Sequence, residues 1–468
     1  MLKMKSKILK TMLSIVAVIL STLSFVTTSH GAVKLSHNGH GEMLMAPFYS
    51  VANNVSTLIS IKNTQRGASK AVKVRFNESG SGIAVLEFNL YLNPNDSWAA
   101  ALSMNDQGEI SLTSNDSSCT FGYNSPQPFN LTKLESAETD ASLEDLLNRI
   151  QTGSIEIYDM GTENLTQTGC DAINDAWAEG GQWANDPSLG PVTGGLNATL
   201  TLIQVANGFA VTTPITAFND FYAEDVNPHT LPDSDQPNLN DANQQSQLLI
   251  DDQLITTNWP LGFQSVGALI TFVNLSNDYD VSPSINGKAE WIFTFPTKSY
   301  AVNTENSSPF NVGLMNETGQ LCMMDATNCF NNESIDREAD NFCYLSIVSP
   351  PPPSIPAACQ TTNVVIFADE DPASNIEISS ALANSYDIFG VKTQGWFNQN
   401  FTGIRSGRWF YNKLGIGEDQ TPHTYWGLPV IGFSFNQYTN TNAQPGLLAK
   451  YATANAFATQ RRIEIDSQ

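Results

Sequence analysis

Short apolar or alternating runs, separated by clusters of Asn, Gly, Ser and Pro, recur along most of the chain. Such a pattern is typical of antiparallel strands that bury one face. It predicts strands over 43–49, 57–61, 71–76, 85–92, 98–102 and 154–160 in the first half, and over 266–274, 289–295, 363–368 and 428–435 in the second. We therefore expect a mainly β fold of one or two antiparallel β-sandwich (Ig-like) domains.

Local signals add a hairpin and a few short helices. Asn207-Gly208 separates the apolar segments 198–206 and 209–218, and this pair suits a type I′ turn, which needs positive φ at both central residues. Ser142 can cap a helix over 143–151, and a second, weaker helix is expected over 171–178.

The composition changes near the middle of the chain. From Glu224 to Gln247 the sequence is polar and rich in Asp, Asn, Gln and Pro. This predicts a polar linker or long loop over 224–254, between β-rich domains at 32–223 and 255–468. The proline-rich segment 350–356 is expected to be a stiff spacer, with a docking ligand for another protein as the alternative.

The N-terminus carries four lysines, then an apolar stretch over 12–26 and small residues before Ala32. This layout predicts a secretory signal peptide over 1–31. A membrane anchor would need ~20 apolar residues, and this stretch is shorter and broken by Ser and Thr. We expect an exported protein, at the cell surface or extracellular, with the periplasm as the alternative and no membrane span after cleavage.

Acidic residues outnumber basic ones by 46 to 22, for a net charge of −24 that becomes −28 without the four lysines of the signal peptide. Only 15% of residues are charged, so the acidity reflects scarce bases as well as abundant acids. Nucleic acids and anionic lipid surfaces bind clustered bases. The composition therefore argues against both partners.

Six cysteines fit an oxidising compartment; they are Cys119, Cys170, Cys322, Cys329, Cys343 and Cys359. Closing a short loop costs less entropy, which favours a Cys119–Cys170 pair and leaves the other four to pair among themselves. A zinc site is the alternative, but no Cys-x-x-Cys spacing exists.

Motifs for chemistry are scarce. The sequence contains no Gly-rich phosphate loop, no His-Glu-x-x-His and no Gly-x-Ser-x-Gly, so we expect no enzyme. Acidic clusters could supply oxygen ligands to a structural Ca²⁺, or could be solvated loops. The weak calcium candidates are Asp278, Asp280, Asp369, Glu370 and Asp371.

Aromatic residues gather near the C-terminus. Trp409, Tyr411, His423 and Trp426 resemble a sugar-binding platform, and an ordinary sheet edge would give the same pattern. His229 lies in the predicted linker, where a solvated loop histidine is expected.

Several sequence segments, taken together, resemble those of a known protein family. Gly39-His40-Gly41-Glu42 leads into Pro47-Phe48-Tyr49, and the second half contains Trp291-Ile292-Phe293-Thr294-Phe295-Pro296 and Gly427-Leu428-Pro429-Val430-Ile431-Gly432-Phe433. On these strings the chain resembles a family of exported Gram-negative bacterial proteins, mostly uncharacterised and sometimes labelled surface-layer or cell-surface proteins. The resemblance implies a place at the cell surface and brings no activity or catalytic residue with it.

These observations favour an exported structural protein of the cell surface or extracellular space. It would associate with itself or with the cell envelope through β-sheet surfaces. The alternative is a carbohydrate-binding or adhesive module that uses aromatics such as Trp396, Trp409, Tyr411 and Trp426. A hydrolase with a carboxylate pair is the third hypothesis.

Overall fold

The structure is a computed structural model that describes residues 31–466 with several gaps. The gaps are 164–168, 207, 225, 303–307, 318, 326–331, 337–340, 343–355, 369–377, 379–384, 390–392, 405–407 and 445–446. Ala32–Gln468 forms one compact unit, and Met1–Gly31 is a separate one. The predicted signal peptide, the acidic triplet at 369–371 and most of the proline-rich segment lie outside the described residues.

The first half of the compact unit forms two antiparallel sheets. The seven-stranded sheet has the order β1 (Lys34–Leu35), β13 (Thr216–Asn219), β2 (Met43–Ser50), β10 (Thr152–Glu163), β4 (Ser69–Glu78), β5 (Ala84–Leu92), β8 (Cys119–Phe121). The six-stranded sheet has the order β12 (Phe209–Thr213), β11 (Leu196–Gln204), β3 (Ser56–Asn63), β6 (Ser97–Met104), β7 (Ile110–Thr113), β9 (Gln127–Pro128). Alternate residues such as Val74, Phe88 and Ile155 of the first sheet pack with Ile61 and Trp98 of the second in one core.

Helices join these strands. They are α2 (Thr132–Ala137), α3 (Leu143–Arg149), α4 (Cys170–Trp177) and α5 (Gln182–Asn185). Ser142 caps α3 by accepting a hydrogen bond from the backbone N–H of Asp145, as the sequence predicts. The helix predicted over 171–178 is confirmed as α4.

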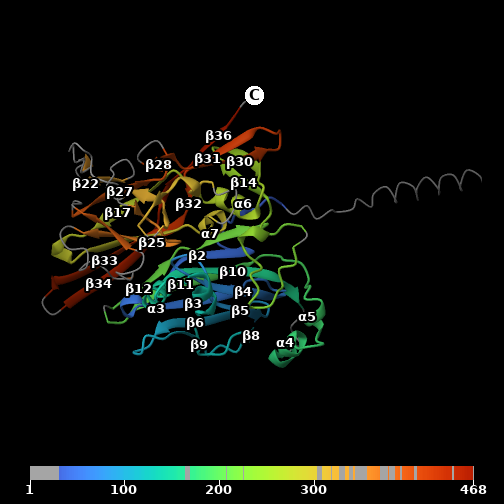
Figure 1. The fold of residues 1–468 in the computed structure, drawn as a ribbon. Helices are drawn as coiled ribbons and strands as arrows, with labels where there is room; N and C mark the ends of the chain where they lie inside the picture. The colour runs from blue at the N-terminus through green and yellow to red at the C-terminus, as the bar shows by residue number, and fades with distance from the viewer. Residues whose placement is uncertain are drawn as a thin grey trace, which may run out of the picture. The chain divides into compact units, whose positions relative to one another are not determined.

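The described residues of the second half form three five-stranded sheets and four small two-stranded ones. Figure 1 labels strands of these sheets such as β17, β25 and β33. The first has the order β26 (Ser385–Phe389), β25 (Thr362–Ala368), β18 (Lys288–Thr294), β33 (Ile431–Gln444), β34 (Leu447–Ala456). The second has the order β23 (Asn341–Phe342), β22 (Asn332–Asp336), β27 (Gln394–Asn400), β17 (Asn274–Asp280), β35 (Ala458–Gln460). The third has the order β14 (Gln245–Ile250), β15 (Gln253–Asn258), β30 (Tyr411–Gly417), β31 (Pro422–Trp426), β36 (Arg462–Ile465).

The small sheets pair β16 (Thr271–Phe272) with β32 (Leu428–Pro429), β19 (Leu314–Met315) with β20 (Leu321–Cys322), β21 (Met324–Asp325) with β24 (Pro356–Ala357), and β28 (Gly403–Ile404) with β29 (Arg408–Trp409). The pairing of β25 with β26 is parallel, and the other strand pairs are antiparallel. The prediction of a mainly β, antiparallel fold is confirmed. The chain builds several sheets instead of one or two sandwiches, and an Ig-like arrangement is not confirmed.

Aromatic packing connects the two halves. Phe48 of β2 contacts Phe433 of β33 with ring centroids 6.2 Å apart, and Phe209 of β12 contacts Phe435 at 5.5 Å. These residues belong to one buried cluster with Ile292 and other apolar side chains of the second half. The two halves therefore share this core. Their division into two separate domains stays a prediction.

Two predicted strands are wrong in detail. The apolar run 266–274 begins inside helix α6 (Gly262–Leu269) instead of forming one strand. Every residue of α6 is buried, so no polar face marks the helical period, and a short apolar run alone cannot separate helix from strand. The second arm of the predicted hairpin, 209–218, breaks at Pro214 into β12 and β13, because proline has no N–H for the ladder.

The structure pairs Cys119 with Cys170, as predicted, and Cys322 with Cys359. Cys329 and Cys343 lie outside the described residues. The first bond ties the edge strand β8 to α4, across a sequence separation of 51 residues. Disulfides are typical of oxidising, extracellular or periplasmic compartments.

Replacing both members of this pair, Cys119→Ser with Cys170→Ser, should lower the free energy of unfolding by about 2–4 kcal/mol, because the unfolded chain regains the entropy of an open loop. Urea unfolding followed by tryptophan fluorescence measures this difference. An unfolding midpoint equal to that of the parent protein would contradict the prediction.

Candidate functional site

The outer face of the seven-stranded sheet carries charged and polar side chains. Val74 and Phe76 of β4 point into the core. Side chains alternate along a strand, so Arg75 and Asn77 point to the opposite face. Glu156 of β10 lies directly opposite Arg75 in the strand register. All of these residues are buried, so another part of the chain must cover this face.

The cover is a segment that we call the strap, residues 229–241. Lys73 Nζ donates hydrogen bonds to its carbonyl oxygens at Leu231 (3.1 Å), Ser234 (2.6 Å) and Gln236 (2.6 Å). Burial, followed by the charge of Arg75, lowers the pKa of Lys73 to about 7. The polar segment predicted over 224–254 is therefore fastened to the sheet along this part of its length.

Arg75 lies at the centre of a buried ionic network. Its Nε donates to Glu87 Oε1 at 2.8 Å, and its Nη1 lies 3.6 Å from Glu156 Oε2. Lys133 Nζ contacts the second oxygen of Glu87 at 2.5 Å. Tyr158 donates its hydroxyl to Glu156 Oε2 at 2.8 Å. Opposite charges meet here in one network, as burial of charge requires.

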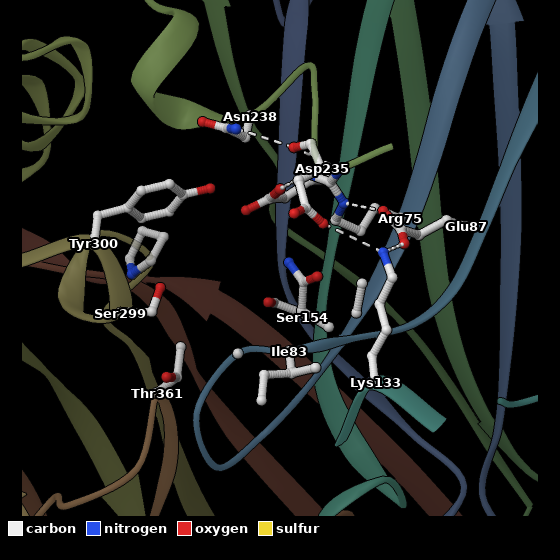
Figure 2. Close-up of a pocket in the computed structure, with 15 residues that line it drawn as sticks. Arg75, Ile83, Glu87, Lys133, Ser154, Asp235, Asn238, Ser299, Tyr300 and Thr361 are labelled. Atoms are coloured by element: carbon white, nitrogen blue, oxygen red, sulfur yellow. Dashed lines mark hydrogen bonds and ion pairs between the residues drawn. The ribbon is translucent and has the colours of Figure 1, made fainter. Parts of the chain in front are cut away.

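A cavity of about 250 Å³ opens beside this network. Figure 2 shows Ser154 of β10 on its sheet side, Asp235 and Asn238 of the strap above, and Tyr300 and Thr361 of the second half on the far side. Pockets often form where two parts of a chain meet, and the groups here are mostly polar. No local sequence pattern identifies this cavity, because its walls come from segments far apart in the chain.

His229 is buried at 0% exposure, so the prediction of a solvated loop histidine is wrong. Its Nδ1 lies 2.7 Å from the Pro187 carbonyl and its Nε2 lies 3.1 Å from the Tyr91 hydroxyl. The carbonyl can only accept, so Nδ1 carries the proton. The rings of Trp177 and Trp183 pack against the imidazole, with centroids 4.9 and 4.7 Å away, and burial lowers the His229 pKa to about 4. This neutral histidine anchors the strap.

The structure brings together three of the four predicted ligand-binding residues. Trp409, Tyr411 and Trp426 form what we call the aromatic patch. The Trp426 ring lies 6.4 Å from that of Trp409 and 5.3 Å from that of Tyr411, between ring centroids. The Arg462 guanidinium lies 4.6 Å from the centre of the Trp426 ring. Trp409 is 52% exposed, so the patch faces solvent there.

His423 does not join this patch. It is three residues from Trp426 on β31 and therefore points to the other face of the sheet, where it is 5% exposed. Its Nδ1 lies 2.8 Å from the Thr257 hydroxyl. Trp396 is 40% exposed but lies on β27, in a different sheet.

Two of the five calcium candidates, Asp278 and Asp280, lie among the described residues. Asp278 is an exposed residue of β17, and the buried Asp280 accepts a hydrogen bond from the Ser282 N–H at 3.0 Å. Asp369, Glu370 and Asp371 lie outside the described residues. Within the described part of the chain, no group of three or more His, Cys, Asp or Glu side chains is arranged to hold a metal ion.

Glu42 is a perturbed acid that the sequence did not single out as such. Its carboxylate accepts a hydrogen bond from the Phe221 N–H at 2.7 Å. Burial, with smaller contributions from the charges of Asp159 and Asp220, raises its pKa to about 7. These neighbours come from distant segments, so no local pattern could have identified them.

Comparisons with protein-family models, with curated proteins and with solved structures found no match to this chain. Among the described residues no helix is long and apolar enough to cross a membrane. The functional argument therefore depends on the geometry of the sites.

The variant Glu42→Gln tests the perturbed carboxyl. Glu42 holds its proton more tightly in the folded state, so its contribution to stability is present below pH 4.5 and is lost as the pH rises through about 7. The free energy of unfolding of Glu42→Gln should therefore rise relative to the parent by about 1–3 kcal/mol between these pH values.

Urea unfolding at a series of pH values measures the difference. The variant Glu135→Gln provides the control for loss of a carboxyl group, because Glu135 is an exposed residue of α2. A constant difference between Glu42→Gln and the parent across this pH range would contradict the prediction.

Proposed function

We propose that this protein is an exported, cell-surface or extracellular binding protein, and that the aromatic patch attaches it to carbohydrate. Its disulfides support an oxidising location, and the predicted signal peptide supports export. The family resemblance also favours the cell surface. The single observation that carries the proposal is the gathering of Trp409, Tyr411 and Trp426 on one solvent-facing surface.

The geometry of the patch suits a sugar ring. Aromatic faces offer a large apolar area at low conformational cost, and Tyr and Trp keep a polar atom at their edge. Tyr411 and Trp426 are directly opposite each other on β30 and β31, and Arg462 continues the row on β36. Such a row follows an extended polymer better than it encloses a small molecule.

Cations lie over two of the three rings of the patch. Lys413 Nζ is 4.7 Å from the centre of the Tyr411 ring, and Arg462 is paired with Glu464. In a chain with a net charge of −24, this arrangement would reduce the repulsion of an acidic polysaccharide at the patch. Both neutral and acidic glycans therefore belong in the test.

A glycan array of the exported protein should show binding to a restricted set of polysaccharides. Trp409→Ala should weaken that binding by at least about tenfold, because stacking is lost at an exposed site that supports no core. Trp396→Ala is the matched control, since Trp396 is also an exposed tryptophan on a strand but lies away from the patch. A blank array, or equal losses in both variants, would count against the proposal.

Self-association as a structural component is the second candidate, and exposed sheet edges favour it. β36 pairs with β31 on one side, and its Ile465 is 48% exposed. β34 lies at another edge and presents Tyr451, which is 50% exposed. Unpaired edges with exposed apolar side chains can add a strand from another chain.

Sedimentation velocity tests this candidate. With calcium chloride the protein should form larger species that dissociate in EDTA, because divalent cations would offset the repulsion between acidic chains. Ile465→Lys should abolish them, and Val205→Lys, in an exposed turn, should not. Sedimentation that is unchanged by EDTA and by Ile465→Lys would exclude assembly of this kind.

A further inference from the structure

The cavity beside Arg75 is a separate feature from the aromatic patch. Its walls come from the outer face of the seven-stranded sheet, from the strap and from segments near Tyr300 and Thr361 (Figure 2). At about 250 Å³ it is smaller than the ~300–1,000 Å³ that is usual for drug-sized ligands. It could hold one small molecule.

The cations at the cavity are already occupied. Arg75 donates to Glu87 and to the strap carbonyls of Ser234, Asp235 and Pro237. Lys133 donates to Glu87 and Asp235. The lining also carries three carboxylates, those of Glu87, Glu156 and Asp235, against these two cations. An anionic ligand would therefore find no free cation and would face a net negative charge.

One neutral polar atom that lines the cavity is buried without a hydrogen-bond partner among the described residues, and a serine hydroxyl lies beside it. Asn77 is 6% exposed, and its Oδ1 is buried without a hydrogen bond. Ser154 lies directly opposite Asn77 on β10, is 4% exposed, and its hydroxyl has no side-chain partner among the described residues. A buried polar group without a partner costs about 1–3 kcal/mol, so such groups call for an explanation.

Two further groups extend this surface. The Glu156 carboxylate uses Oε2 for Tyr158 and Arg75, and its Oε1 has no partner in the described part of the chain. Thr361 contributes a hydroxyl from the second half. The ring of Tyr300, with Pro296 and Ile83, adds apolar surface. The cavity thus combines an amide, hydroxyls and one carboxylate oxygen with one aromatic ring.

We propose that this cavity binds a single neutral sugar of monosaccharide size. A sugar offers adjacent hydroxyls that both donate and accept, which matches the amide of Asn77, the hydroxyl of Ser154 and the free oxygen of Glu156. Its apolar C–H face would lie on Tyr300. An amino acid fits less well, since its carboxylate would need a free cation.

Isothermal titration calorimetry tests the proposal with D-glucose, D-galactose, D-mannose and N-acetyl-D-glucosamine as neutral probes, and with D-glucuronate as a charged one. At least one neutral probe should bind with a Kd of about 1 mM or tighter, and D-glucuronate should bind at least about tenfold more weakly. If no neutral probe binds with a Kd of about 1 mM or tighter, or if D-glucuronate binds less than about tenfold more weakly than the best neutral probe, the proposal is wrong.

Variants locate the binding. Asn77→Leu and Ser154→Ala should each weaken it by about tenfold or more. The controls are Asn436→Leu and Ser434→Ala on β33, two buried side chains without a hydrogen-bond partner that do not line this cavity. Parent-like binding by Asn77→Leu, or equal losses in the controls, would overturn the assignment.

Folding and the patch are checked separately. Without sugar, Asn77→Leu should unfold at the same temperature as the parent or higher, because it removes an unsatisfied amide. Trp409→Ala should keep monosaccharide binding, so failure of the aromatic patch and failure of this cavity are distinguishable. Loss of monosaccharide binding in Trp409→Ala would place the sugar at the patch and refute the proposal for the cavity.

Discussion

The pairing of buried cations on the outer face of β4 constrains most of this fold. A buried ammonium or guanidinium group costs several kcal/mol unless it is paired and hydrogen-bonded. Lys73 donates to three carbonyl oxygens of the strap. Arg75 shares the Ser234 carbonyl with Lys73 and also donates to two further strap carbonyls and to Glu87. The strap must therefore lie in one place. That placement in turn buries His229 and brings Asn238 to the cavity.

The second half is attached through the same region. Backbone N–H groups of Thr361 and Thr362 donate to the carbonyls of Gly80 and Ser79, in the loop after β4. That loop is held by Glu78, which accepts from the N–H of Gly80 and pairs with Arg149 at 2.9 Å. Polar contacts thus fix the position of Thr361 opposite the sheet, while the Phe48 and Phe209 contacts supply apolar packing at the other end of the junction.

The sequence predicts the strands of the first half for two reasons. β3 and β6 alternate buried with more exposed positions, whereas β2 and β4 are buried throughout and are recognised as short apolar runs between turn residues. It fails at α6, where complete burial removes the period. The sequence identifies Trp409, Tyr411 and Trp426, which are near neighbours along the chain. It wrongly adds His423, because proximity in sequence does not show that His423 and Trp426, three positions apart on β31, face opposite sides of the sheet. Asn77 and Ser154 could not be identified, since polar residues at alternate strand positions usually face water, and only the tertiary structure shows that the strap covers them.

His229 and Glu42 together have a consequence for proton balance. Unfolding exposes a histidine that regains its usual pKa of 6.5, so the fold loses stability through His229 as the pH falls from 6.5 towards 4. Glu42 acts in the opposite direction, since its pKa is about 7 in the fold and 4.5 when exposed. At mildly acidic pH, His229 takes up a proton when the protein unfolds and Glu42 releases one, so the two changes nearly cancel. These two buried groups therefore buffer the stability of the fold against acidification of its surroundings.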